Sequence, residues 1–271
     1  MAPPTFRERL AVLADLGTAY SAEIPGHDPA APTAWPLWPD AAALTDHLGG
    51  NHRWAAAMVR TGERVDRRTV PPAPTDGVRA WFDDGVHDLL GALDEAGPDR
   101  PTWRIGVDPA GTTGFWARRM VIETAKHLAD LRAGDSRRWT APPELPSAHA
   151  ADAVDELFEV FLPRSRPTLA TLPGALRLRA DDIRVDWVVG EDWTVRRDPA
   201  APSGDAAVPV AQPVRADALE TAITHPAATV SGGIGDLLLL CWERAAPADP
   251  RLRIEGDAGV VDAFAASPVH P

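Results

Sequence analysis

Residues 116–131 read Trp-Ala-Arg-Arg-Met-Val-Ile-Glu-Thr-Ala-Lys-His-Leu-Ala-Asp-Leu, and this stretch decides how the first half of the chain folds. Trp116, Met120 and Leu131 recur at the spacing of one face of a helix. Glu123 and His127 are four residues apart on that face, about one turn from each other. A carboxylate and an imidazole that point into an apolar core are costly unless they are paired or bind a metal.

Three further amphipathic segments precede this helix, separated by breaks rich in Pro and Gly. Their apolar stripes run over residues 6–16, 44–58 and 78–93. Asp40 is expected to cap the second helix, and Thr75 and Asp76 to open the third. Four amphipathic helices of this length predict an all-helical bundle up to about residue 140.

After Pro142-Pro143 the pattern changes from a helical period to a period of two. The run 199–213 is interpreted as a surface loop. A helix over about 148–162 precedes strands at 176–180, 183–189, 193–197 and 227–231, then a helix at 237–242, a strand at 252–254 and a helix at 258–265. The prediction is a two-domain α+β fold, with a four-helix bundle over residues 1–141 and a small α+β domain over residues 148–268.

Composition narrows the class of protein and its partners. The 271 residues carry a formal net charge of -12, which argues against nucleic acid as a partner. No stretch approaches the roughly 18 apolar residues of a membrane span, and the first residues lack the order of a secretory signal. The one cysteine, Cys241, leaves no internal disulfide. We expect a cytoplasmic protein without a membrane partner, either a monomer or a homodimer.

A third inward-facing group comes from the second helix, where His47 lies between Leu44 and Leu48. With Glu123 and His127 it makes a set of two histidines and one carboxylate that leaves coordination positions open, as in catalytic zinc sites. The same set suits ferrous iron or nickel. A plain ion pair between Glu123 and His127, with a hydrogen-bonded core histidine, is the alternative.

Two other histidines were weighed as ligands. His52 lies about 140° around the helix from His47, so both cannot face one ion. His87, at the edge of the third stripe, could be a further ligand, a general base or a residue without a role, and the last is favoured.

Segments 45–55 (Thr-Asp-His-Leu-Gly-Gly-Asn-His-Arg-Trp-Ala) and 118–130 resemble the paired signatures of the mycothiol-dependent maleylpyruvate isomerase family, whose first domain is a DinB-like four-helix bundle. Residues 228–244 and 252–257 look like that family's second, sterol-carrier-like domain. The resemblance implies that His47, Glu123 and His127 hold zinc and that mycothiol, a low-molecular-weight thiol, is the cosubstrate.

The chain departs from the family pattern at three positions. Ile122 and Leu128 stand where histidine and arginine are common, and Glu243 where glycine precedes the arginine matched by Arg244. Arg244 would suit a substrate carboxylate by its bidentate geometry, although such arginines are often structural. Asp130 is kept, either as a partner of a ligand histidine or as a solvated carboxylate.

These residues predict a metal- and mycothiol-dependent enzyme that activates a thiol for attack on a small electrophile. A thiol with a pKa of about 8.5 is mostly protonated at neutral pH, and metal binding deprotonates it. Cis-trans isomerisation or S-transfer would follow, and the departures favour S-transfer. The alternatives are a non-catalytic metal- or ligand-binding accessory protein and a hydrolase that uses zinc-activated water.

Overall fold

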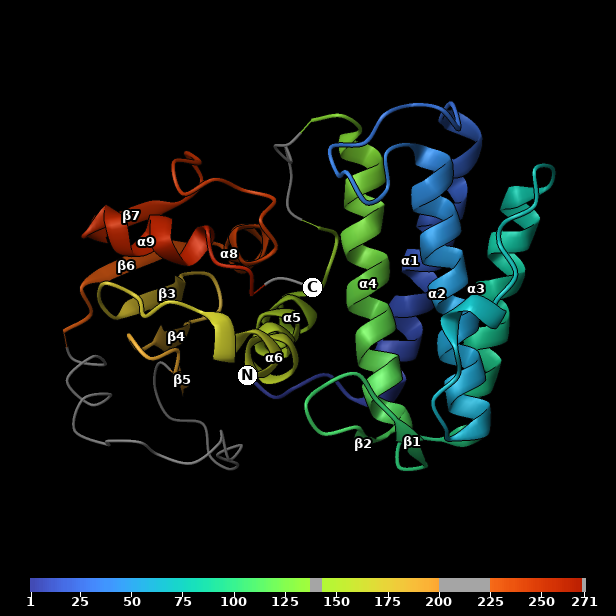
Figure 1. The fold of residues 1–271 in the computed structure, drawn as a ribbon, viewed down its shortest axis with the longest axis horizontal. Helices are drawn as coiled ribbons and strands as arrows, with labels where there is room; N and C mark the ends of the chain where they lie inside the picture. The colour runs from blue at the N-terminus through green and yellow to red at the C-terminus, as the bar shows by residue number, and fades with distance from the viewer. Residues whose placement is uncertain (137–142, 200–224, 270–271) are drawn as a thin grey trace. The chain divides into compact units, whose positions relative to one another are not determined.

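The computed structural model describes residues 1–136, 143–199 and 225–269. The chain divides into two compact units: a helical unit, Pro4–Leu145, and a sheet unit, Met1–Pro3 with Pro146–Pro271 (Figure 1). A helical region followed by a domain with a mixed sheet is the two-domain α+β class that the sequence predicts, and this prediction is confirmed.

Long helices lie side by side in the helical unit (Figure 1). They are α1 (Phe6–Glu23), α2 (Ala41–Thr61), α3 (Val78–Ala96) and α4 (Thr113–Ala133), with short 3-10 turns η1 (Ile24–Gly26) and η2 (Arg67–Thr69). Their apolar faces form one core, which includes Leu13, Leu16, Leu44, Leu48, Met58, Phe82, Leu89, Leu93, Trp116, Met120 and Leu131. The four stripes of the sequence therefore meet as a bundle requires.

The observed starts of α2 and α3 test the capping residues that the sequence predicts. The side chain of Asp40 accepts a hydrogen bond from the backbone N–H of Ala43, so the predicted cap of α2 is confirmed. The predicted start of α3 at Thr75 and Asp76 is wrong. The helix begins at Val78 after Gly77, whose φ of 73° is a left-handed conformation that glycine adopts without a steric penalty.

The expectation of an all-helical first domain is wrong, because a small β-hairpin lies between α3 and α4. Strands β1 (Pro101–Trp103) and β2 (Ala110–Thr112) pair antiparallel. Each has three residues, too few for a period of two to be recognised. The hairpin is attached to the bundle, since Trp116 Nε1 donates to the Trp103 carbonyl oxygen at 2.7 Å.

The sheet unit contains a five-stranded sheet in the order β5-β4-β3-β6-β7, in which β3 and β6 are parallel and the other neighbours antiparallel. Helix α8 contacts β3, β6 and α5, and α9 contacts β6. The elements are α5 (Ser147–Glu156), a π-helical turn η3 (Leu157–Phe161), α6 (Leu162–Ser165), η4 (Arg166–Thr168), β3 (Leu176–Ala180), β4 (Val185–Val189), β5 (Val195–Pro199), β6 (Ala228–Gly232), α8 (Ile234–Cys241), β7 (Arg253–Gly256) and α9 (Ala258–Ala265).

Two strands start later than predicted because tight turns precede them. Arg184 has φ 53° and Trp193 has φ 64°, so neither lies in an extended strand, and β4 and β5 start later than the expected residues 183 and 193. The expected surface loop at 199–213 lies, beyond Pro199, outside the described residues. Within the described ranges, no helix is both long and apolar enough to cross a bilayer.

Two glycines give a paired test of the bundle. A Cβ at Gly49 of α2 would lie 2.3 Å from the ring of Trp81, which the Arg53 guanidinium covers at 4.0 Å. We expect Gly49→Ala to destabilise the helical unit by about 1–3 kcal/mol through overpacking. Gly91→Ala on α3, where a Cβ meets nothing within 4 Å, should stabilise it by about 0.5–1 kcal/mol. Denaturant midpoints that shift in the same direction for both would contradict this packing.

Candidate metal centre

Three side chains from two helices meet inside the bundle: His47 of α2 with Glu123 and His127 of α4. One ligand atom from each lies within 4.8 Å of the other two. Nε2 of His47 is 3.1 Å and Nε2 of His127 is 3.3 Å from Glu123 Oε1. The structure therefore brings together the three residues for which the sequence predicts metal ligation.

The cluster is buried but not sealed. The side chain of His127 is fully buried and that of Glu123 is 7% exposed, whereas that of His47 remains 25% exposed. Burial on α4 follows from the core-facing stripe of Trp116 and Met120. An exogenous group can therefore approach from the side of His47.

The two carboxylate oxygens of Glu123 have different neighbours. Oε2 accepts a hydrogen bond from Arg119 and lies 3.9 Å from Lys126 Nζ, while Oε1 faces the two imidazoles. Burial alone raises the pKa of Glu123, but Arg119, Lys126 and His127 outweigh it and hold that pKa well below its usual range. Glu123 is therefore ionised at neutral pH, with Oε1 available as a ligand.

His47 has the protonation state that a metal ligand requires. Burial lowers the pKa of His47 more than its hydrogen bond to Glu123 raises it, so the imidazole is neutral at pH 7. Two imidazole nitrogens and one carboxylate oxygen suit zinc, ferrous iron or nickel. Ligand bonds of about 2.0–2.2 Å are compatible with the separations of 3.1 and 3.3 Å between each histidine Nε2 and Glu123 Oε1. The residues present fit a divalent metal.

The amide of Asn51, one turn beyond His47, points at the same place. Its Nδ2 lies 3.0 Å from both His47 Nε2 and Glu123 Oε1. An amide nitrogen only donates, so Glu123 Oε1 accepts from it, and His47 Nε2 accepts from it in the tautomer that carries its proton on Nδ1. The amide N–H groups thus add partial positive charge beside these two atoms.

Asp130 and Trp38 contact the two histidines of the cluster. Asp130 Oδ2 lies 3.0 Å from His127 Nδ1, the ring nitrogen that does not face Glu123. The Trp38 ring lies 4.4 Å from the His47 ring and 4.7 Å from the His127 ring, measured between centroids. Asp130 is therefore placed to fix the tautomer of His127, while Trp38 restricts the movement of both rings.

The other histidines stay outside the cluster. His52 is buried, its Nε2 lies 2.8 Å from Thr124 Oγ1, and burial lowers its pKa to about 3. His87 is exposed on α3. Among the described residues, neither histidine belongs to the group whose ligand atoms converge.

Arg244 and Arg119 both have partners within the protein. Arg244 follows the end of α8, where it is buried and its Nη1 donates to the Trp242 carbonyl oxygen at 2.7 Å. Arg119 pairs with Glu123. Arg244 is in the sheet unit, so a role in substrate binding stays a prediction.

Sequence reasoning missed three neighbours of the cluster. Asn51 was assigned only to the apolar stripe, although its i+4 spacing from His47 was a usable signal. Trp38 and Arg67, whose Nε donates to Asn51 Oδ1 at 3.3 Å, lie on connecting segments where no periodicity points to a partner.

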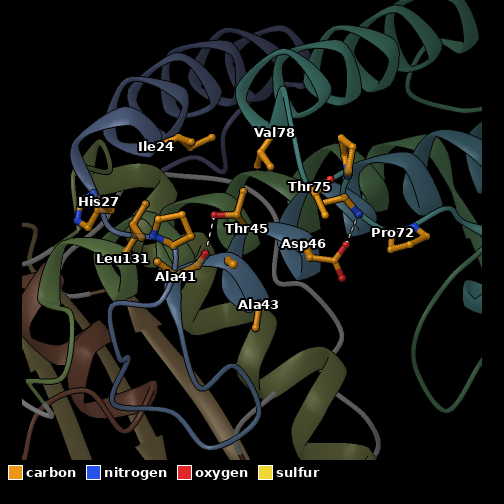
Figure 2. Close-up of a pocket in the computed structure, with 14 residues that line it drawn as sticks. Ile24, His27, Ala41, Ala43, Thr45, Asp46, Pro72, Thr75, Val78 and Leu131 are labelled. Atoms are coloured by element: carbon orange, nitrogen blue, oxygen red, sulfur yellow. Dashed lines mark hydrogen bonds between the residues drawn. The ribbon is translucent and has the colours of Figure 1, made fainter.

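A pocket of about 400 Å³ opens near the cluster, between the end of α1 and the starts of α2 and α3 (Figure 2). Its lining is mostly Ala, Pro and aliphatic residues, together with the polar residues His27, Thr45, Asp46 and Thr75. Thr45 donates to the Ala41 carbonyl oxygen, and Asp46 accepts from the Ala73 N–H. None of the three clustered residues lines this pocket, so we assign it no part in the centre.

A helical bundle that presents a histidine and carboxylate cluster, followed by a mixed-sheet domain, defines a class of two-domain α+β proteins. Family comparison specifies the class. The model described as mycothiol maleylpyruvate isomerase N-terminal domain matches residues 10–132, and the MDMPI C-terminal domain matches residues 148–263. The chain belongs to the mycothiol-dependent maleylpyruvate isomerase family, and it is an enzyme of that family.

Solved structures agree on the fold. The crystal structure of the mycothiol-dependent maleylpyruvate isomerase is 15% identical, with a TM-score of 0.60 over 94% of this chain and 96% of that one. A mutant of that isomerase in which a histidine is replaced by alanine is 14% identical, with a TM-score of 0.60 over the same shares. A comparison with curated protein sequences finds no match.

The cluster predicts about one divalent ion per chain. His127→Ala removes a fully buried ligand and should lose most of the metal, whereas His87→Ala removes an exposed histidine outside the cluster and should keep it. Elemental analysis of protein purified without chelators measures both. Full metal content in His127→Ala would refute the assignment.

Asp130 provides a test of the support behind His127. Asp130→Asn keeps the size of the side chain but weakens its acceptor, so metal affinity should fall by about 10- to 100-fold without loss of the fold. Competition with a chromogenic chelator measures the affinity, and circular dichroism checks the fold. An affinity equal to that of the unmodified protein would show that Asp130 does not tune His127.

Proposed function

We propose that this enzyme binds a divalent metal, zinc in the first instance, at His47, Glu123 and His127 and uses it to activate the thiol of mycothiol for attack on a small electrophile. The observation that carries the proposal is the convergence of three ligand atoms beside a partly exposed His47. Three protein ligands leave a position for an exogenous group, as in catalytic rather than structural sites.

The protein's own cysteine does not supply the thiol. Cys241 is fully buried in α8, and burial raises the pKa of its thiol to about 12. A thiol in that setting is neither accessible nor ionised, so the nucleophile must come from outside. Family membership supports mycothiol as that thiol.

The residues around the proposed metal have separate roles. A bound metal supplies the charge that lowers the pKa of the incoming thiol. Glu123 provides an anionic ligand whose charge Arg119 and Lys126 compensate, and Asp130 orients His127. Trp38 covers the two imidazole rings and excludes water from that side.

Two reactions follow from the same thiolate. In isomerisation the sulfur adds to a conjugated double bond, the resulting single bond rotates, and the sulfur leaves with the double bond restored. In S-transfer the sulfur remains on the product after addition or after a leaving group departs. The apolar residues Ile122 and Leu128, at positions where the family pattern has histidine and arginine, favour S-transfer on a substrate other than maleylpyruvate.

Thiol binding should depend on the metal. Calorimetry is expected to show mycothiol binding to zinc-loaded protein, and at least about tenfold weaker binding after chelation or in His47→Ala. His87→Ala is the matched control. Mass spectrometry of protein, mycothiol and candidate electrophiles then separates isomerised product from S-conjugate. Equal thiol affinity with and without metal would contradict the proposed activation.

A further inference from the structure

Arg67 lies beside the candidate metal centre, where a hydrogen bond and close packing hold its side chain. It lies in η2, and its Nε donates to Asn51 Oδ1 at 3.3 Å, while the other end of the same amide faces His47 and Glu123. The guanidinium packs against the backbone of Gly50, where a Cβ would lie 1.9 Å from Arg67 Nη2. Only glycine at position 50 leaves room for this arrangement.

The guanidinium is partly removed from water yet has no carboxylate partner within the part of the chain that the structure describes. Burial lowers the pKa of Arg67, with Asp46 acting in the opposite direction from a distance. Asp46 instead accepts a hydrogen bond from the Ala73 N–H. By contrast, the next residue, Arg68, is exposed and pairs with Asp66 at 2.7 Å.

We propose that Arg67, held in place by Asn51, binds a carboxylate of the electrophile next to the metal centre. A guanidinium offers two parallel N–H donors to a carboxylate, and Nη1 and Nη2 are the donors that Asn51 does not use. One amide separates them from the ligand atoms, so a small molecule anchored at Arg67 reaches the open side of the cluster. This inference rests on the proposed function and names the residue of this chain that would meet the carboxylate of its electrophile.

Succinate tests the inference without any reaction, since a saturated dicarboxylate offers no double bond to a thiol. Calorimetry on metal-loaded protein should show succinate binding that weakens by about 10- to 100-fold in Arg67→Gln. Arg68→Gln removes the same charge from a neighbouring exposed side chain and should bind succinate like the unmodified protein. Succinamide, the uncharged analogue, should bind to none of the three.

Gly50→Ala provides a second variant that keeps the arginine. Its new Cβ displaces the guanidinium, so succinate affinity should fall although no charge is lost. Metal content and circular dichroism, measured for every variant, separate this effect from damage to the centre or the fold. Arg67→Lys, which retains a charge but not the bidentate fork, should bind succinate with intermediate affinity.

Three outcomes would overturn the role of Arg67: no succinate binding to the unmodified protein, equal affinity in Arg67→Gln, or an equal loss in Arg68→Gln. The last would mean that long-range charge alone is responsible. Succinate binding is measured without thiol, so it remains informative if mycothiol is never consumed. That failure would count against the proposed function and not against the carboxylate site.

Discussion

The carboxylate of Glu123 is the constraint on which the site depends. An ionised carboxylate in a bundle core costs several kcal/mol unless other charges and hydrogen bonds compensate it. Arg119, Lys126 and His127 lie at i−4, i+3 and i+4 from Glu123, so one unbroken helix supplies most of this compensation. Oε2 meets the cations, Oε1 is left for the histidines, and α2 needs to add only His47 and Asn51.

The regular spacing of apolar residues was sufficient to predict the long helices and the side chains that face their core. The core-facing stripe of α4 contains Glu123 and His127, so the inward direction of both could be predicted from the sequence. The β1–β2 hairpin, Gly77 and the turns at Arg184 and Trp193 could not, because each depends on the conformation of one or a few residues. Arg67 could not be placed either, since only tertiary packing brings η2 against α2.

The hydrogen bonds of Asn51 connect the two halves of the site. Its Nδ2 faces two prospective metal ligands, and its Oδ1 accepts from Arg67. One side chain therefore links the candidate metal ligands of α2 and α4 to the guanidinium of η2.

The departures from the family pattern at Glu243 and Leu128 have different structural consequences. Glu243 has φ 59°, a left-handed conformation that costs a non-glycine residue about 1 kcal/mol. Glu243 thus adopts the left-handed turn that glycine favours, at a position where the family pattern has glycine, and the chain continues into Arg244. Leu128, by contrast, packs into the bundle core, so no cation exists where the pattern has arginine. Arg67, whose Nε donates to Asn51 Oδ1, instead places a guanidinium one amide away from the candidate ligands.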